Sequence, residues 1–272
     1  MAKAPARFLP RAILFGVGLA GLLLVLSRPH PGSAERVEGI APTKAEIERL
    51  LRLEITALEA EVAIDTPWGA LAAKPATRGQ VDRYLPLLCQ ELRKYPPELI
   101  ARIGLRRVVL CRDLSLGKQP RAAVPLRDHD SLHLDVVAGH YSCDYQRIVV
   151  HHELMHVIDD RDDGKVYEDG EWAALNATQF RYGNGGIHAQ HDQRASLHTT
   201  GVQGFLTSYA TTAVEEDKAE LFARLMVEPD YVAKRAEEDA ILRAKVARLR
   251  ELLLAFCPQF DGRAWPDTAP RV

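Results

Sequence analysis

The chain has 272 residues, and its 35 Lys and Arg against 37 Asp and Glu give a formal net charge of −2. Without residues 1–34, which carry four basic and no acidic side chains, the balance is 31 to 37, or −6. This balance argues against a nucleic acid or an anionic membrane as the partner. The length allows one sizeable core, or a core with a small subdomain, and no internal repeat or heptad run divides it.

The N-terminus has the features of a secretory signal sequence. Three basic side chains within residues 3–11 precede the uncharged run of residues 12–26. The small residues 32–34, Gly-Ser-Ala, then offer a cleavage site. We therefore expect residues 1–34 to be a signal peptide and the protein to be exported, as a periplasmic, extracellular or cell-surface protein. The uncharged run is shorter than the about twenty residues of a membrane-spanning helix, and an uncleaved N-terminal anchor is the alternative.

Residues 35–80 are predicted to be a linker followed by an N-terminal helical segment. Residues 44–62 predict an amphipathic helix because their apolar side chains follow the helical period. These apolar residues are Ile47, Leu51, Ile55, Leu58 and Val62. The main domain is expected at residues 81–260, with a C-terminal tail at residues 261–272.

The main domain is predicted to be an α+β fold that is mainly helical and has a small sheet. Two helices are expected at residues 80–94 and 97–103, with Pro86 either breaking the first helix or marking its start. Apolar, β-branched runs predict strands at residues 107–111 and 132–137. Helices are predicted in the rest of the chain at residues 145–160, 213–227 and 233–256.

The helix predicted at residues 145–160 is indicated by its ends and its composition. Asp144 is a good N-cap candidate ahead of an apolar-periodic run. No Gly or Pro occurs between residues 145 and 160, and Asp-Asp-Gly at residues 162–164 indicates a stop and a turn. Its β-branched residues lower the helix propensity slightly, which a buried helix tolerates because packing decides more than propensity.

This helix carries an HExxH motif, His152-Glu153-Leu154-Met155-His156. On a helix, two histidines four residues apart lie on one face and can together bind one Zn²⁺. Glu153, beside the first ligand, can then act as the general base on the attacking water. His151 lies off the shared face, and we interpret it as structural. The alternative is a helix that carries two histidines without a metal.

A catalytic zinc site needs a third protein ligand. One local option is Asp162, but the pattern that places it needs a Gly at position 159, where this chain has Asp159. We favour the helix predicted at residues 213–227, where Glu216 and Glu220 are four apart on one face. Glu216 would bind the metal, and Glu220 would accept the second ring N–H of a ligand histidine. The alternative is a solvated acidic helix face.

The segment before the glutamate helix contains further candidates. Thr211 or Thr212 can cap that helix. Tyr209 can donate its phenol O–H to the carbonyl oxygen on which peptide hydrolysis at zinc builds negative charge. The alternative for Tyr209 is a core residue whose hydroxyl is already hydrogen-bonded.

The loop at residues 164–207 is long, polar and rich in glycine. Loops of this length are usually functional or mobile, and this one leads into Tyr209, so we expect it to form one wall of a substrate cleft. Its histidines, His188, His191 and His198, could supply a second metal. We disfavour that option because loop histidines are mostly solvated or structural.

The chain has four cysteines, Cys89, Cys111, Cys143 and Cys257. None forms a Cys-x-x-Cys pair, which argues against a separate thiolate zinc site. An even count in an exported chain predicts up to two disulfides, and we expect Cys89 to pair with Cys111 because the two are close in sequence. The alternative is four small buried hydrophobic residues.

The HExxH helix and the glutamate helix together resemble a known group of enzymes. The segment from His152 to Asp160, followed by Tyr209 and by Glu216 and Glu220, resembles the zinc-peptidase domain of anthrax lethal factor, a gluzincin-like site. Over roughly residues 85–257 the chain is also similar to a bacterial family of zinc-binding metallopeptidases. The blocks that carry this second resemblance are Tyr95-Pro96, Leu110-Cys111, Asn176 to Gly183 and Glu216 to Glu220.

The resemblance implies a zincin-like domain in which the motif helix packs against the glutamate-bearing helix. The ligands, the base and the oxyanion donor that it implies are His152, His156, Glu216, Glu153 and Tyr209, with Glu220 bonded to a ligand histidine. The other domains of lethal factor have no room in this chain, so its substrate and its delivery are not carried over.

We therefore predict an exported, monomeric zinc metallopeptidase that hydrolyses a peptide or protein substrate and has no nucleic-acid partner. No membrane association is expected beyond the N-terminal anchor named above. One alternative is another zinc amide hydrolase, such as an amidase acting on cell-wall peptides. The other is a non-catalytic, zinc-containing binding protein. Glu153 argues against the binding protein, since a binder needs the ligands but not the base.

Overall fold

The fold is given by a computed structural model that describes residues 42–183, 185 and 197–260. The predicted signal segment and the predicted tail at residues 261–272 lie outside these ranges, as do His188 and His191. Within the described ranges, no helix has both the length and the apolar character that crossing a membrane requires. The assignments made for the N-terminal segment therefore stay predictions.

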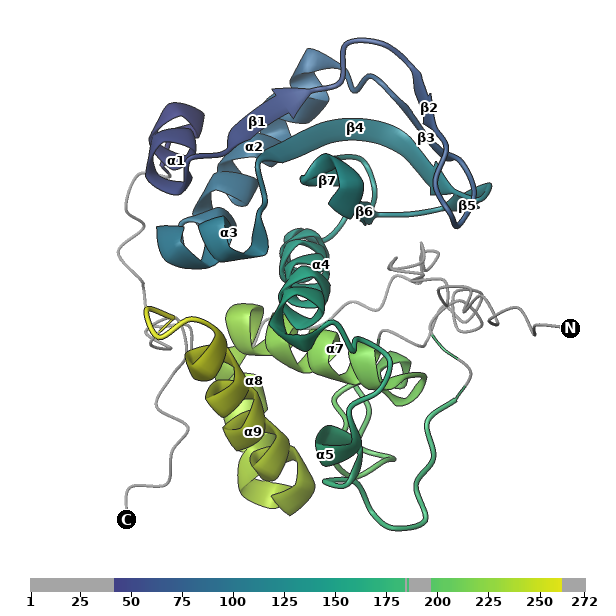
Figure 1. The fold of residues 1–272 in the computed structure, drawn as a ribbon, viewed down its shortest axis with the longest axis vertical. Helices are drawn as coiled ribbons and strands as arrows, with labels where there is room; N and C mark the ends of the chain where they lie inside the picture. Colours follow the sequence, from purple (N-terminus) through teal and green to yellow (C-terminus); the bar gives the residue numbers. More distant parts are fainter. Residues whose placement is uncertain (1–41, 184, 186–196, 261–272) are drawn as a thin grey trace, which may run out of the picture.

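The described residues form an α+β fold in which a mixed sheet lies over a layer of helices (Figure 1). The strands are β1 Glu54–Ala57, β2 Val62–Ile64, β3 Leu71–Lys74, β4 Arg107–Leu116, β5 Gln119–Pro120, β6 Ala123–Leu126 and β7 Ser131–Asp135. Their order is β2-β3-β4-β7-β6, and β1 and β5 also pair with β4. β1 and β7 run parallel to β4, whereas β6 runs antiparallel to β7. β6 is the last strand in this order and forms an edge of the sheet.

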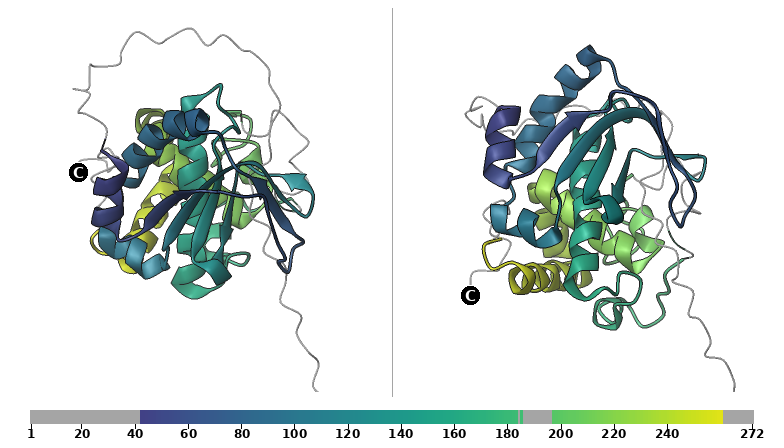
Figure 2. Two further views of the ribbon diagram at one scale, coloured as in Figure 1. Left: turned by 90° about the horizontal axis from the view of Figure 1, so that it is seen from above. Right: turned by 45° about the horizontal axis from the view of Figure 1, so that its top comes forward.

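The helices form two groups around a central one. They are α1 Lys44–Leu51, α2 Arg78–Leu92, α3 Pro97–Ile103, α4 Cys143–Asp163, α5 Gly170–Ala173, α7 Val214–Val227, α8 Pro229–Glu238 and α9 Ala240–Phe256. Figures 1 and 2 show α4 between the sheet and the C-terminal helices α7, α8 and α9. α4 packs against α7 on one side and against β6 and α2 on others. The helix that carries the HExxH motif is therefore the centre of the fold.

The core has two parts because the central strands are buried on both faces. Leu132 and Leu134 of β7 belong to the large cluster between the sheet and the helices. Cys111 of β4 and Val124 of β6 belong to a smaller cluster with residues of the β2–β3 hairpin. Every residue of β6 and of β7 is buried. β6, with the sequence Ala-Val-Pro-Leu, shows no polar alternation, which explains why it gave no strand pattern in the sequence.

Several predicted elements agree with the structure. α3 has the predicted bounds, and β4 and β7 overlap the two predicted strands. The helix predicted at residues 80–94 is α2, which begins at Arg78 because Thr77 and Gln80 form a capping box. Pro86 lies inside α2, so it neither breaks this helix nor marks its start.

The helix predicted at residues 44–62 is wrong beyond its second turn. α1 ends at Leu51, and Arg52 has the left-handed conformation with φ of 55°. The chain then enters β1, where Ile55 is 1% exposed and pairs with Val108 of β4. Ile47 and Leu51 thus belong to α1, whereas Ile55 belongs to a strand, because pairing with β4 overrides the local pattern there.

The single helix predicted at residues 233–256 is two helices, α8 and α9. They meet at Asp239, whose backbone is extended with φ of −125° and ψ of 103°. The Asp239 carboxylate accepts hydrogen bonds from the backbone N–H groups of Ile241 and Leu242, both at 3.0 Å. An Asp inside an apolar-periodic run is therefore a helix start here.

The predicted N-caps of the two site helices are also wrong. Ser142, not Asp144, caps α4, and its hydroxyl accepts a hydrogen bond from a backbone N–H three residues on. Ala213 precedes α7 without a side-chain cap. Thr211 and Thr212 lie before this N-cap, and their hydroxyls donate to the backbone carbonyls of Ser208 and Tyr209.

All four cysteines lie within the described residues and carry free thiols, so the predicted Cys89–Cys111 disulfide is wrong. Cys89, Cys111 and Cys257 are buried and belong to the apolar clusters. These three cysteines agree with the alternative prediction of small buried hydrophobic residues. Cys143 does not, because it is exposed at the start of α4.

Candidate metal centre

The packing of α4 on α7 brings the candidate ligands together. His152 and His156 are one turn apart on α4, and Glu216 and Glu220 are one turn apart on α7. A short 3-10 turn at Tyr209–Thr211 precedes α7 and packs against it. All of these side chains except that of Thr211 are buried, so the site lies within the helical layer.

Three side-chain atoms converge between the two helices. His152 Nε2 lies 3.0 Å from Glu216 Oε2 and 3.0 Å from His156 Nε2. His156 Nε2 lies 3.4 Å from Glu216 Oε2. Each of the three residues is 1% exposed or less. Within the described residues, this is the one group of three or more His, Cys, Asp or Glu side chains whose ligand atoms are close enough to hold a metal ion.

The donor set and its spacing fit a zinc ion. Two imidazole nitrogens and one carboxylate oxygen are the three protein ligands of a His₂Glu catalytic zinc site. Ligands about 2.0–2.1 Å from a tetrahedral zinc ion lie about 3.3 Å from one another, close to the spacings found here. Lone pairs that face one another at this range repel unless a cation or a proton lies between them.

The second ring nitrogen of His152 is held by Glu220. His152 Nδ1 lies 3.2 Å from Glu220 Oε1, and the hydroxyl of Thr207 donates to Glu220 Oε2 at 2.9 Å. Arg224 lies beside the same carboxylate, with Nε 3.8 Å from Oε2. This arrangement orients the imidazole so that Nε2 points at Glu216.

Burial and hydrogen bonding act in opposite directions on the carboxylate of Glu216. Burial alone would raise its pKa, but hydrogen bonds from His152 and His156 outweigh that effect and lower the pKa to about 2. Burial would likewise raise the pKa of Glu220, and the hydrogen bond from His152 outweighs it. Both glutamates are therefore carboxylates at neutral pH, the form in which a carboxyl group binds a metal or orients a histidine.

Glu153 and Tyr209 lie in the same buried region. Glu153 follows His152 on α4 and is 0% exposed. The Tyr209 hydroxyl donates to Glu216 Oε1 at 3.0 Å, and the Tyr209 ring centroid lies 6.0 Å from that of His152. The structure thus brings Glu153, Tyr209 and the three converging residues together.

The other predicted metal positions lie elsewhere. Asp162 is exposed in the last turn of α4, and it is not part of the converging group. Asp159 accepts a hydrogen bond from Lys218 Nζ at 2.5 Å, which ties the end of α4 to α7. His198 stacks on Tyr231 with ring centroids 4.1 Å apart.

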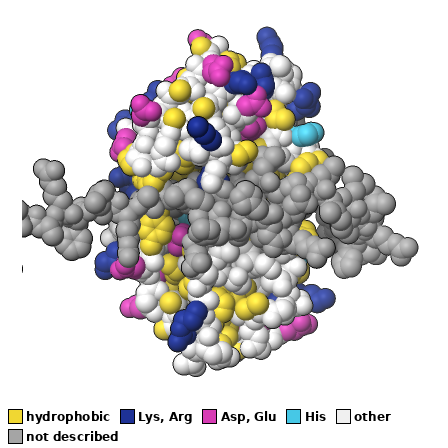
Figure 3. Space-filling view, turned by 90° about the vertical axis from the view of Figure 1, so that its right-hand side faces the viewer, with side chains coloured by type: hydrophobic (Ala, Val, Ile, Leu, Met, Phe, Trp, Pro, Cys, Tyr) yellow, Lys and Arg dark blue, Asp and Glu magenta, His cyan; other side chains and the backbone are white. Residues whose placement is uncertain are grey.

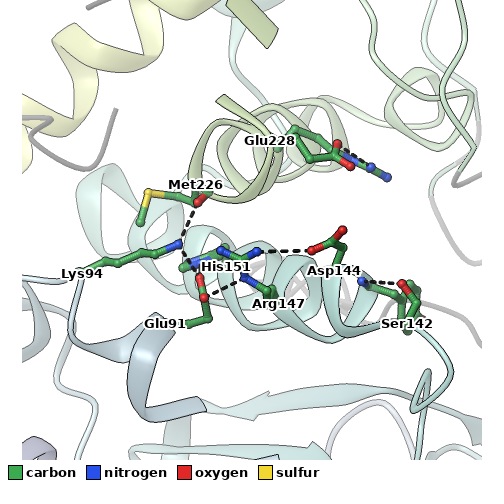
Figure 4. Close-up of polar contacts among 10 residues, drawn as sticks. Glu91, Lys94, Ser142, Asp144, Arg147, His151, Met226 and Glu228 are labelled. Carbon is green, nitrogen blue, oxygen red and sulfur yellow. Dashed lines mark hydrogen bonds and ion pairs between the residues drawn. The ribbon is translucent and has the colours of Figure 1, made fainter. Parts of the chain in front are cut away.

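His151 points away from the converging group, as predicted, and takes part in a buried polar network (Figure 4). Its Nε2 lies 2.6 Å from Glu91 Oε2, and its Nδ1 lies 2.5 Å from the Tyr95 hydroxyl. Lys94 Nζ donates to Glu91 Oε2 at 2.5 Å and to the carbonyl of Met226 at 2.8 Å. The network therefore joins α2, the motif helix and the last turn of α7.

A second buried network holds the segment before α7 in place. Asp217 Oδ2 accepts hydrogen bonds from Trp172 Nε1 at 2.8 Å, the Tyr182 hydroxyl at 2.6 Å and Lys245 Nζ at 2.7 Å. Asn176 Nδ2 in turn donates to the Tyr182 hydroxyl at 3.0 Å. Part of the block from residue 176 to 183 thus has a structural role that positions α7.

Sequence reasoning missed Arg121, which lies between β5 and β6. Its side chain is 0% exposed and interacts electrostatically with Tyr209, Glu153 and Glu216. Burial lowers the pKa of Arg121, and those three neighbours oppose that effect. No motif surrounds this residue, and only the packing of the sheet edge on α4 brings it to the site.

The face of the molecule shown in Figure 3 carries side chains of both signs. Lys and Arg are interspersed with Asp and Glu among the described residues of this view, with apolar side chains between them. The described part of this face therefore presents no extended field of one sign.

Comparisons with known proteins add one likeness. No family model and no curated protein matches the chain. The chain is similar to a solved structure described as a "putative zinc-binding metallo-peptidase" from Bacteroides caccae, with 14% identity and a TM-score of 0.47. The likeness covers 81% of this chain and 88% of that chain. What the site can do follows from its own residues and geometry.

Proposed function

We propose that the protein is a zinc-dependent peptidase. The observation that supports this most directly is the convergence of His152 Nε2, His156 Nε2 and Glu216 Oε2 beside the buried carboxyl group of Glu153. A site that only stores or binds zinc needs the three ligands, but it does not need a fourth, acidic group beside them to act as a general base.

The side chains that would hold the metal are His152, His156 and Glu216. A bound zinc ion polarises the carbonyl group of the substrate and lowers the pKa of water. Glu220 keeps the ring of His152 oriented through Nδ1, at 3.2 Å. Burial of all four side chains keeps bulk water from competing for the ligand atoms.

Glu153 acts as the proton carrier. Its carboxylate takes a proton from the water that attacks the peptide carbonyl carbon, and it then gives that proton to the leaving amine nitrogen. Tyr209 faces the same region and can donate to the carbonyl oxygen only when its hydroxyl leaves Glu216 Oε1. Tyr209 is a hydrogen-bond donor to that oxygen once it has left Glu216.

The substrate, assembly and location of the enzyme are also proposals. The substrate is a peptide or protein, since the site holds the groups that hydrolysis of an amide bond needs. The enzyme acts as a monomer, and its export rests on the signal features of residues 1–34 alone.

One experiment tests this function against its two alternatives. The exported protein is purified, its zinc content is measured, and it is incubated with a denatured proteome and with cell-wall peptides. Peptides released are identified by mass spectrometry, with the Glu153→Gln variant as the matched control. Zinc-dependent release of proteome peptides, absent in the variant, supports a peptidase. Release from the cell-wall peptides alone indicates an amidase, and stoichiometric zinc without cleavage of either indicates a binding protein.

A further inference from the structure

Arg121 is a buried cation at the edge of the sheet. It follows β5 and precedes β6, the edge strand that packs against α4. Its backbone N–H donates to the carbonyl of Leu114 at 2.8 Å, and its Nη2 donates to Gln119 Oε1 at 2.8 Å. These two bonds hold the main chain and one end of the guanidinium group in place.

The rest of the guanidinium group lacks acceptors. Nε and Nη1 are buried and have no hydrogen-bond partner among the described residues. These two nitrogens carry three of the five N–H donors of an arginine. Leaving charged donors unpaired in a protein interior is costly, so these nitrogens need acceptors that the described residues do not supply.

The electrostatic neighbours of Arg121 indicate which atom would accept hydrogen bonds from its unpaired N–H groups. The three groups with which it interacts electrostatically are Tyr209, Glu153 and Glu216, the donor, the base and a ligand of the proposed reaction. The one hydrogen of the Tyr209 hydroxyl is directed to Glu216 Oε1 at 3.0 Å. Arg121 therefore has buried N–H groups without a partner among the described residues, and it lies within electrostatic range of the reacting groups.

We propose that Arg121 is a catalytic residue that donates hydrogen bonds to the oxygen of the scissile carbonyl and stabilises the negative charge that develops there. This inference rests on the proposed peptidase function and extends it, since Tyr209 was the donor expected from the sequence. An arginine supplies both a full positive charge and several N–H groups to that oxygen.

The charges balance through the reaction. As the water oxygen bonds to the carbonyl carbon, the π electron pair of the C=O bond moves to the carbonyl oxygen, and the water proton moves to Glu153. Glu153 thereby loses its negative charge at the moment when the carbonyl oxygen gains one. When the C–N bond breaks, its electron pair goes to nitrogen, which receives the proton from Glu153, and the C=O bond re-forms. Glu216 stays a carboxylate throughout, and the negative charge that moves faces Arg121 first on Glu153 and then on the oxygen.

The test compares binding of a transition-state mimic with binding of the ground state. The two probes are a peptide found to be cleaved by the enzyme and its phosphinic analogue, in which a tetrahedral, anionic phosphinate replaces the scissile amide. Dissociation constants of both are measured in the zinc-loaded Glu153→Gln background, which cannot turn over. Arg121→Gln and Arg121→Lys are compared with Arg106→Gln, a control at an arginine whose side chain is 79% exposed. Zinc content and melting temperature are recorded for each variant.

We expect Arg121→Gln to weaken binding of the phosphinic peptide by about 10²-fold or more and to change binding of the amide peptide by less than about threefold. In the Glu153 parent, the same change should lower kcat by about 10²–10³-fold with little effect on KM. Arg121→Lys keeps a cation with fewer donors and should lose about tenfold. Arg106→Gln should behave as its parent.

Two results would overturn the inference. One is equal weakening of both probes, which means that Arg121 supports the fold or binds the ground state. The other is unchanged binding of both probes. If Arg121→Gln does not fold, the ratio of the two dissociation constants in Arg121→Lys decides. Failure of the proposed function shows separately, because the enzyme with Arg121 intact would then neither cleave the peptide nor bind the phosphinic analogue, and this inference would fall with it.

Discussion

Replacing Glu91 by Gln should destabilise the protein although Glu91 touches no candidate ligand. Its carboxylate, 1% exposed, receives Lys94 Nζ at 2.5 Å, Arg147 Nε at 2.8 Å and His151 Nε2 at 2.6 Å. Burial would raise the pKa of Glu91, but the hydrogen bond from His151 and the charge of Lys94 outweigh it and lower the pKa from 4.5 to about 2. A carboxamide keeps the volume and loses the charge, which leaves two cations beside a neutral group.

The size of the effect follows from that pKa shift. A shift of one pKa unit corresponds to about 1.4 kcal/mol, so ionised Glu91 contributes about 3 kcal/mol to the free energy of unfolding. Because the pKa of the folded state is the lower one, this contribution is complete above pH 4.5 and is lost as the pH falls towards 2. Glu91→Gln should therefore be about 3 kcal/mol less stable than the parent at pH 7, and the difference should shrink in acid.

The assay is urea unfolding followed by far-UV circular dichroism at pH 7 and at pH 3, with a chelator present so that metal binding does not enter. Glu59→Gln, at an exposed glutamate, is the matched control and should change the free energy of unfolding by less than about 0.5 kcal/mol. A loss below about 1 kcal/mol for Glu91→Gln at pH 7, or a loss that is the same at pH 3, would refute the assignment of a stabilising charge to Glu91.

Three further predictions concern catalysis, metal binding and acid stability. Glu153→Gln should keep its zinc and lose about 10²–10⁴-fold in kcat, measured on a peptide substrate, because the amide cannot take the water proton; equal turnover contradicts the role of base. Glu216→Ala should bind zinc far more weakly than the parent, Glu220→Ala about 10–100-fold more weakly, and Asp162→Ala as tightly as the parent. Equilibrium titration with zinc measures the affinity of all three variants. An empty site in Asp162→Ala alone would reverse the ligand assignment. Burial lowers the pKa of His133 from 6.5 to about 4, so the unfolded state binds the proton first and stability falls as the pH drops from 6.5 to 4. Urea unfolding of His133→Phe should lack up to about 3 kcal/mol of that fall, and a parallel pH dependence in the two proteins would contradict it.

The parts of the fold that could be predicted depend on contacts close in sequence. The end of α4 follows from Gly164, which adopts φ of 76° and closes the helix. The pairing of His152 with His156 follows from the helical period alone. Glu216 and Glu220 were placed with the histidines because they lie four residues apart on a predicted helix, and a resemblance supported the choice. The structure brings the four side chains into one cluster. The role of each in binding metal stays a prediction.

The parts that could not be predicted depend on partners far away in the chain. β1 pairs with β4 across more than fifty residues, and the local period of Ile55 and Leu58 gave a helix instead. Arg121 has no local pattern at all, because its environment is made by α4 and by the turn at Tyr209. Glu91 likewise looks like any helical glutamate until α4 places His151 and Arg147 beside it.

α4 is unusual because it buries polar side chains on several faces, and each face has its own partner. His152 and His156 face Glu216 on α7, whereas His151 faces Glu91 on α2. A buried polar group without a partner costs free energy, so any rotation or sliding of α4 would break contacts on both sides at once. The rotation of α4 about its axis is thereby determined by hydrogen bonds as well as by apolar packing. A reaction that depends on the position of Glu153 beside the ligands needs a helix held in this way.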